Sequence, residues 1–162
     1  MASPGRQHGK SWLEFAVAAS VISLRAFFTL GALWRAQGQA EATLVDLTLR
    51  NMATGLRFKQ LDLLLRGDAP GMAALAGANP VAWLGGPPAN YLGEVAGDPP
   101  ARQPAWYFDK RRGELAYRPG AGTFPLPEGA AELRWRVERS GGSAAMPGAR
   151  IRPVTNSGNA VK

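Results

Sequence analysis

The sequence predicts an α+β protein with one long N-terminal helix, a small three-stranded antiparallel sheet packed on the second half of that helix, and a disordered C-terminal tail. Three observations lead to this prediction. An apolar run from Phe15 to Trp34 continues without proline into an amphipathic segment that ends near Arg66. Two short strand-like segments flank a turn at residues 109–113. A further segment, Ala131 to Arg139, alternates apolar and charged side chains as a half-exposed strand does.

The apolar run is long enough to cross a membrane. At about 1.5 Å per residue, a helix from Phe15 to Trp34 reaches about 30 Å, the thickness of the hydrocarbon core of a bilayer. Arg25 lies inside the run, where a central arginine costs about 2.5–3.5 kcal/mol on insertion. Glu14 stands at its edge. The run is therefore a marginal span, and the carboxylate beside it needs an explanation.

Two ordinary interpretations compete for this segment. A secretory signal peptide has an apolar stretch of about 7–15 residues before a small-residue cleavage site, and Ala36-Gln37-Gly38 is a weak match to such a site. A plain signal anchor would keep Arg6 and Lys10 in the cytoplasm and would retain the run as a single span. Neither interpretation accounts for Glu14.

The leader carries a resemblance to a known family. Gly9, four further residues, then Glu14-Phe15 and an apolar helix resemble the class III signal of type IV pilins and type II secretion pseudopilins. The resemblance implies that a prepilin peptidase cuts between Gly9 and Lys10 on the cytoplasmic side, that Lys10 becomes an N-methylated terminus, and that the helix stays on the mature chain. It also implies that Glu14 is offset by the terminal amine of a neighbouring subunit, since a buried charge is tolerated only when it is paired.

Arg25 is a second assembly candidate, because a charged residue in a span is a functional candidate by default. One hypothesis is that it pairs with Glu14 of an adjacent subunit, since eleven residues span about 16 Å along a helix and subunits of a fibre are staggered. The other is that it lowers the hydrophobicity of the anchor and eases extraction into a fibre. The candidate site is thus Gly9 and Lys10 for cleavage, Lys10 for methylation, and Glu14, Phe15 and Arg25 for assembly.

The rest of the chain reads as a small head and a tail. One helix is expected from about Ser11 to Arg66, and Gly67-Asp68-Ala69-Pro70-Gly71 should end it. Its second half repeats apolar residues at steps of three or four: Ala42, Val45, Leu49, Met52 and Leu56. These features divide the chain into a leader (1–9), a transmembrane and assembly helix (10–34), a head (35–139) and a disordered tail (140–162).

The head is expected to hold a hairpin and a third strand. Residues 72–104 read as a short helical turn followed by loops, with Trp83, Tyr91 and Trp106 as core aromatics. Within this region, Asn-Pro, Pro-Pro-Asn-Tyr and Trp-Tyr-Phe-Asp elements follow in an order that resembles a subset of pilin-like minor proteins. Strands at 105–109 and 114–118 should form the hairpin.

Composition narrows the function classes. The chain has no cysteine and one histidine, His8, which lies in the expected leader. Thiol, Ser-His-Asp and most zinc chemistry are therefore excluded for a cleaved chain, and we expect no enzyme, no cofactor and no metal. The net charge is +7, but the basic residues are spread along the chain without a recognised nucleic-acid module, so no nucleic acid is expected as a partner.

The sequence therefore predicts a structural subunit, a minor pilin or pseudopilin of a type IV pilus or a type II secretion pseudopilus. Its expected partners are the inner membrane, the prepilin peptidase and other pilin or pseudopilin subunits. It would cross the inner membrane once, with its head in the periplasm, before it enters a fibre. The alternative is a single-pass inner-membrane protein with a small periplasmic binding domain.

Overall fold

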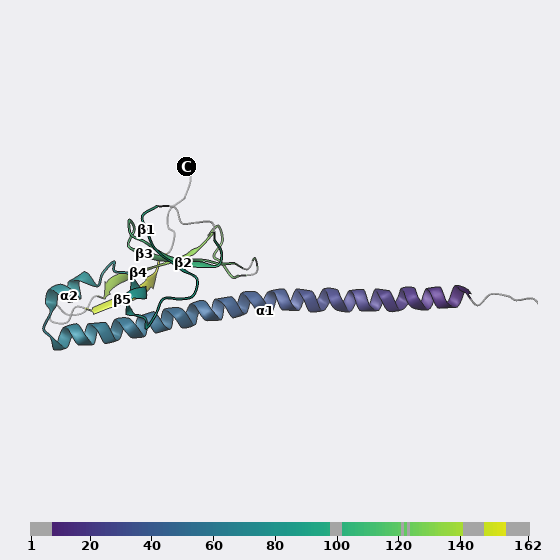
Figure 1. Cartoon of the computed structure of the whole chain (residues 1–162), viewed down its shortest axis with the longest axis horizontal. Helices are drawn as coiled ribbons and strands as arrows, with labels where there is room; N and C mark the ends of the chain where they lie inside the picture. The colour runs from purple at the N-terminus through teal and green to yellow at the C-terminus, as the bar shows by residue number, and fades with distance from the viewer. Residues whose placement is uncertain (1–7, 98–101, 121, 123, 141–147, 155–162) are drawn as a thin grey trace, which may run out of the picture.

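The computed structural model describes residues 8–97, 102–120, 122, 124–140 and 148–154. One helix, α1 (His8–Leu65), has 58 residues and is about 87 Å long. Its N-terminal half extends well beyond the rest of the molecule, which lies beside its C-terminal half (Figure 1). The expected single helix from about Ser11 to Arg66 is confirmed.

The polar hydroxyls within α1 do not interrupt it. Each of five Ser and Thr side chains donates a hydrogen bond of 2.8–2.9 Å to the carbonyl four residues earlier: Ser20, Thr29, Thr43, Thr48 and Thr54. This bond satisfies the hydroxyl on the surface of its own helix. The hydroxyls of Ser20 and Thr29, in the apolar half, thus need no partner from outside the chain.

The helix ends as the glycine at position 67 predicts. Gly67 has a φ of 65°, its N–H donates to Leu64 O at 3.1 Å, and the N–H of Asp68 donates to Leu63 O at 2.9 Å. This pair of bonds is a Schellman motif, which glycine favours because it adopts positive φ without strain. The carboxylate of Asp68 then accepts from the N–H of Gly71 and caps the short helix α2 (Ala69–Ala74).

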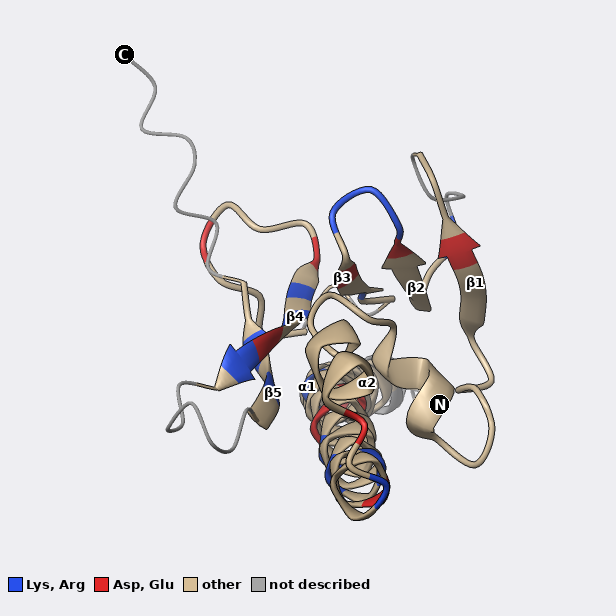
Figure 2. Cartoon of the chain, turned by 90° about the vertical axis from the view of Figure 1, so that its left-hand side faces the viewer, with Lys and Arg blue, Asp and Glu red and all other residues tan. Residues whose placement is uncertain are grey.

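The sheet has five strands, not the three predicted. Their order is β1-β2-β3-β4-β5, and β1 pairs parallel with β2 while the other pairs are antiparallel. The bounds are β1 (Tyr91–Val95), β2 (Ala105–Asp109), β3 (Glu114–Arg118), β4 (Leu133–Ser140) and β5 (Gly148–Pro153). The predicted hairpin is β2–β3, and the predicted third strand is β4. Viewed from the end of α1, the strands lie along one side of the helix (Figure 2).

The two additional strands correct the sequence prediction. β5 lies in the segment predicted as a disordered tail, and it pairs with β4 from Ser140↔Gly148 to Trp135↔Pro153. A strand forms here because β4 would otherwise expose an unpaired edge, and backbone pairing requires little from side chains. β1 lies in the region predicted as loop. It pairs parallel with β2, so no hairpin turn marks the pairing in the sequence. Residues 141–147 and 155–162 of the predicted tail lie outside the described residues.

The core lies between the sheet and the second half of α1. On the helix the buried residues are Val45, Met52, Leu56 and Leu63, with Ala42 and Leu49 packed at the margin. They follow the predicted repeat. On the sheet, the ring of Trp106 packs at a tilt between those of Tyr117 and Trp135, with ring centroids 4.6 Å and 5.6 Å away. Trp106 is buried as predicted, whereas Trp83 and Tyr91 are only half-buried.

A turn of 3₁₀ helix, η1 (Pro80–Trp83), crosses α1 at Gly55. A Cβ on Gly55 would lie 2.2 Å from the carbonyl oxygen of Trp83, so only glycine allows this contact. The side chain of Asn79 caps η1 by accepting from the N–H of Val81 at 3.1 Å, and its amide donates to the hydroxyl of Tyr91 at 2.8 Å. Gly55, which reads from the sequence as a weak point of the helix, is therefore a packing position.

Candidate functional site

The N-terminal half of α1 is an exposed apolar rod. From Trp12 to Trp34 every residue is exposed except Gly31, which is half-buried. Trp12 is 77 % exposed, Phe15 73 % and Phe27 74 %. Large apolar side chains occur all round this half of the helix, and none of them belongs to the core clusters of the head. The head lies beside the other half of α1 (Figure 1). Such a surface is unfavourable in water, because each large apolar side chain gains about 1.5–3 kcal/mol when it is buried.

The helix meets the length and composition of a membrane span. Its Trp12–Leu65 portion contains an 18-residue window with a mean hydropathy of 1.8, of which 0 % is buried. Signal sequences and buried core helices meet the same criterion, but a core helix is mostly covered by its own protein, and this window is not. The helix is thus long and apolar enough to cross a membrane.

The predicted site residues all lie on this helix. Gly9 and Lys10 belong to the first turn of α1, and Phe15 is fully on the surface. Glu14 and Arg25 are both exposed. The structure does not bring them together within one chain, because eleven residues of helix separate their Cα atoms by about 16 Å along the axis. Within one chain, Glu14 and Arg25 are therefore too far apart to pair with each other. A partner for either of them must come from another part of the chain or from another molecule.

The structure has a second exposed apolar surface, which the sequence pattern does not predict. On the side of α1 away from the sheet, five large side chains in the second half of the helix are 51–79 % exposed: Leu44, Leu47, Phe58, Leu61 and Leu65. Their spacing of three, four or eleven residues places them along one face. That spacing is readable in the sequence, but it lies beside the core repeat and is masked by it. The exposed apolar surface thus continues from the first half of α1 along the second.

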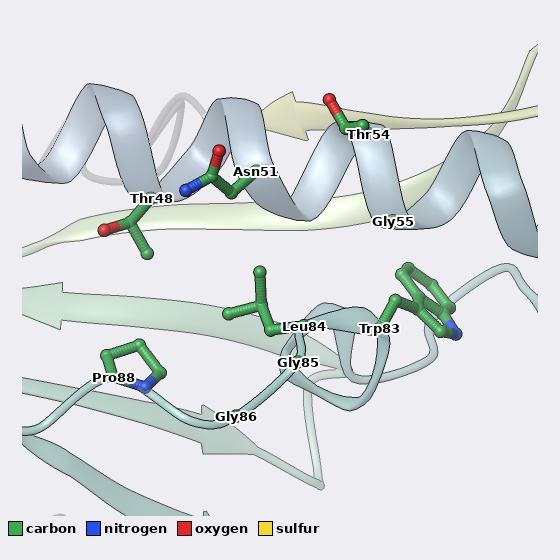
Figure 3. Close-up of a pocket in the computed structure, with 9 residues that line it drawn as sticks. All are labelled: Thr48, Asn51, Thr54, Gly55, Trp83, Leu84, Gly85, Gly86 and Pro88. Atoms are coloured by element: carbon green, nitrogen blue, oxygen red, sulfur yellow. The ribbon is translucent and has the colours of Figure 1, made fainter.

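A groove borders this surface. It encloses about 440 Å³ between α1 and the loop that follows η1 (Figure 3). Its lining is Thr48, Asn51, Thr54, Gly55, Trp83, Leu84, Gly85, Gly86 and Pro88. None of these residues carries a charge or a catalytic acid or base, and the hydroxyls of Thr48 and Thr54 are bonded to backbone carbonyls of α1. The groove offers shape and surface, not reactive groups.

A network of charges lies on the face of the sheet turned away from α1. Arg134 of β4 contacts Glu114 at 3.1 Å, Asp109 at 3.5 Å and Glu132, while Arg136 contacts Glu114 at 2.6 Å. Asp109 and Glu114 are themselves buried, at 9 % and 4 % exposure. Buried carboxylates of this kind persist because each is paired with an arginine.

Tyr107 completes the network. Its hydroxyl donates to Glu132 at 2.6 Å and accepts from Arg134 at 3.1 Å. Burial, followed by the hydrogen bond to the Glu132 carboxylate, raises the pKa of Tyr107 to about 12. A tyrosine that holds its proton so firmly is a poor general base. The ion pairs and hydrogen bonds of the network join β2, β3 and β4 on this face of the sheet.

The sequence places three carboxylates in or beside loops, Asp98, Asp109 and Glu114, but without the dense Asp/Asn/Gly loop that calcium needs. Two of the three lie together in the structure. Asp109 and Glu114 are register partners on β2 and β3, but arginine side chains and turn N–H groups already occupy their oxygens. The basic turn that joins the two strands projects from this end of the sheet (Figure 2). The third, Asp98, lies outside the described residues. Within the described part of the chain, no group of three or more His, Cys, Asp or Glu side chains is placed to hold a metal ion.

Comparisons with protein-family models, with curated proteins and with solved structures found no match to this chain. The long apolar helix with a sheet packed on its second half is compatible with the pilin-like fold that the leader implies.

Proposed function

We propose that this chain is a structural subunit of a fibre, a minor pilin or pseudopilin of a type IV pilus or a type II secretion pseudopilus. One observation carries the proposal: the apolar half of α1 is exposed on all sides and continues without a break into the helix on which the head is built. A rod of this kind can be covered either by lipid or by the helices of other copies. In a fibre subunit, lipid covers the rod first, and the helices of other copies cover it after assembly.

The leader specifies how the exchange would begin. Cleavage between Gly9 and Lys10 removes the residues that hold the N-terminus in the cytoplasm, and Lys10 becomes the terminus that is methylated. The apolar helix then moves from the inner membrane into a bundle of like helices, where Phe15 and its neighbours pack. Glu14 provides the charge that favours the bundle over lipid, because a carboxylate in hydrocarbon is unfavourable until a cation of another subunit meets it.

The exposed face on the second half of α1 supports the same use. Leu44, Leu47, Phe58, Leu61 and Leu65 lie outside the head's own core, and they extend the apolar surface past the expected membrane boundary. A plain anchor has no need of this extension. In a bundle, these side chains would cover parts of neighbouring helices.

Substitution of Glu14 separates a fibre subunit from an anchor, because the two functions predict opposite effects. Glu14→Leu makes the segment more apolar, so a plain anchor is retained in the membrane at least as well as before. A fibre subunit loses the charge that favours assembly, and its recovery in the sheared fibre fraction should fall about tenfold or more. Asp46→Asn, at an exposed carboxylate on the same helix, is the matched control and should leave recovery unchanged. Normal fibre recovery of Glu14→Leu would contradict the proposal.

The groove in Figure 3 favours a second candidate function, a membrane-anchored binding domain in the periplasm. Its neutral lining with one tryptophan suits an uncharged ligand better than an ionic one. In that case Trp83→Ala abolishes ligand binding and leaves the location of the chain unchanged. A fibre defect in Glu14→Leu together with normal assembly of Trp83→Ala would favour the fibre subunit.

A further inference from the structure

Glu14 and Arg25 are the two charged side chains of the exposed apolar half, residues 12–34, and they have opposite signs. Among the side chains that the structure describes, neither has an ion-pair or hydrogen-bond partner. Each is therefore a charge in a segment that has to be covered by lipid or protein. Each needs a counter-charge there.

The spacing of the two residues places them on one face. Eleven residues make about three turns of helix, so the two side chains lie about 20° apart around the axis and about 16 Å apart along it. The same geometry places this face about 160° around the axis from Val45, which is buried under the sheet. The head therefore leaves this face open to another helix.

From this geometry we infer that copies of the chain associate side by side and parallel along this face, shifted by eleven residues, with Arg25 of one copy paired to Glu14 of the next. The inference rests on the proposed function in one respect, that all copies enter the membrane with the same orientation. The guanidinium group can bind the carboxylate through two parallel hydrogen bonds, the strongest form of this ion pair.

Other arrangements leave charges unpaired or heads misplaced. Parallel helices without a shift place Glu14 opposite Glu14 and Arg25 opposite Arg25, so like charges meet. A shift of four residues, which would bring a cleaved terminus at Lys10 to Glu14, leaves Arg25 in the apolar medium without a partner. An antiparallel pair satisfies both charges but places the two heads on opposite sides of the membrane. In a row of parallel copies, the shift of eleven residues lets each inner copy pair Arg25 with one neighbour and Glu14 with the other, and it keeps all heads on one side of the membrane.

This contact also repeats. It uses Glu14 of one copy and Arg25 of another, so each copy retains one unused charge with which to bind a further copy. Each contact also moves the next copy by about 16 Å along the axis, so the row of copies stays open and does not close into a pair or a ring. Charge pairing alone thus supplies both the register and the direction of growth.

The chain has no cysteine, which makes the register directly measurable by disulfide cross-linking. Val21 and Ala32 are also eleven residues apart and lie within about 40° of Glu14 and Arg25 around the axis. Full-length Val21→Cys and Ala32→Cys chains with tags of different size are co-expressed, and the membranes are oxidised. We expect the mixed Val21–Ala32 dimer to exceed the Val21–Val21 dimer about tenfold.

Three alternative patterns would overturn the inference. Dominance of the Val21–Val21 dimer indicates helices without a shift. Dominance of a Val17–Val21 dimer, from the corresponding Val17→Cys chain, indicates the four-residue shift. Dominance of an Ala18–Val21 dimer indicates an antiparallel pair. Each of these patterns excludes the Arg25–Glu14 contact.

Charge reversal tests the pair itself. Arg25→Glu or Glu14→Arg alone places like charges in contact and should reduce the mixed dimer about tenfold, while both substitutions in one chain should restore it. Arg25→Gln is the control for hydrophobicity: a mixed dimer at full yield in this variant would overturn the inference. Carbonate extraction verifies that each variant is inserted, and failure of the double reversal to restore the dimer in inserted chains would also overturn it.

The same membranes distinguish this inference from the proposed function. The mass of the N-terminal peptide shows whether the leader is cut. A mixed dimer with an intact leader supports the pairing and contradicts the processed subunit. A cut leader without the mixed dimer supports the processed subunit and contradicts the pairing of Arg25 with Glu14.

Discussion

Gly55 allows the head to pack closely on α1, although glycine lowers the stability of the helix itself. Glycine lowers helix stability by about 1 kcal/mol relative to alanine, yet it occurs here in the middle of α1, where the carbonyl of Trp83 would lie 2.2 Å from a Cβ. The loss of helix propensity is offset by the close packing of η1. A glycine inside a helical pattern is thus explained by a contact that is distant in sequence.

Gly55→Ala is expected to destabilise the head by about 1–3 kcal/mol, because the added methyl group forces η1 away from α1. The measurement is the thermal unfolding midpoint of the full-length chain in detergent, followed by the fluorescence of its tryptophans. Gly31→Ala is the control, since no atom lies within 4 Å of a Cβ at that position. An unchanged midpoint for Gly55→Ala would contradict the packing assigned to it.

Tyr107 is expected to make the stability of the head fall at high pH. Burial and the bond to Glu132 raise its pKa in the folded state to about 12, from the usual tyrosine value of 10.0. The folded state therefore keeps a proton that the unfolded state loses, so this contribution to stability is fully present below pH 10 and is lost as the pH rises towards about 12. Tyr107→Phe should make the loss of stability over this range less steep. Denaturant titrations at a series of pH values measure it, and an equally steep loss in the variant would contradict this role.

At the scale of elements, Gln60 connects α1 to the last strand. Its side-chain amide donates to Ala149 O and its side-chain oxygen accepts from Ala149 N–H, both at 3.0 Å. The side chain thus occupies backbone groups of β5 that have no strand beside them. An edge strand with few apolar residues is held by this pair of bonds together with the β4 ladder.

Gln60→Ala should loosen β5 without unfolding the head, because two hydrogen bonds of about 0.5–1.5 kcal/mol each are lost. Hydrogen exchange in peptides that cover residues 148–154 should speed up about tenfold or more relative to the wild type, while the β2–β3 peptide stays protected. Lys59→Ala is the control, since Lys59 makes only a long surface contact with Asp62. Unchanged exchange in β5 would show that the β4 ladder alone holds the strand.

Elements with a local pattern were predictable from the sequence. The continuous helix, the β2–β3 hairpin and β4 follow from periodicity, from a glycine turn and from alternation, each of which is visible within about ten residues. Gly113, at the end of that turn, has a φ of 62° and donates its N–H to Asp109 O at 2.8 Å. These local signals agree with the tertiary fold, so they placed the elements correctly.

Elements that depend on distant partners were not predictable. β5 has Ile151 as its one bulky aliphatic residue before its final proline, and it exists because β4 and Gln60 provide partners for its backbone. β1 pairs parallel with β2, and no hairpin turn marks this pairing in the sequence. The charge network was equally hidden, because Glu132 and Arg134 read as the solvated side of β4, whereas they pair with Tyr107 and Glu114 of neighbouring strands.

The candidate site was predictable from the sequence because its residues are close together in the chain. Gly9, Lys10, Glu14, Phe15 and Arg25 all belong to one short stretch of helix, so their relative positions follow from helix geometry alone. What the structure adds is their surroundings: an apolar half that no part of the described head covers, and an apolar face that continues to Leu65.

On the scale of the whole molecule, the chain has two halves with separate requirements. The head takes its core from α1 between Ala42 and Leu63 and from one side of the sheet. The half before residue 35 contributes nothing to that core, so substitutions there should leave the head folded. The apolar sequence of this half is therefore explained by contact with a membrane or with other helices, and not by the fold of the head. The proposed fibre subunit makes both contacts.

The mass of the mature N-terminus tests this proposal most directly. Full-length chain is expressed in cells with and without a prepilin peptidase, and the N-terminal peptide of the membrane fraction is identified by mass spectrometry. We expect a peptide that begins at Lys10, with a methylated amine, only where the peptidase is present. An intact leader that begins before Gly9 in both cells, or a cut after Trp34, would contradict the account.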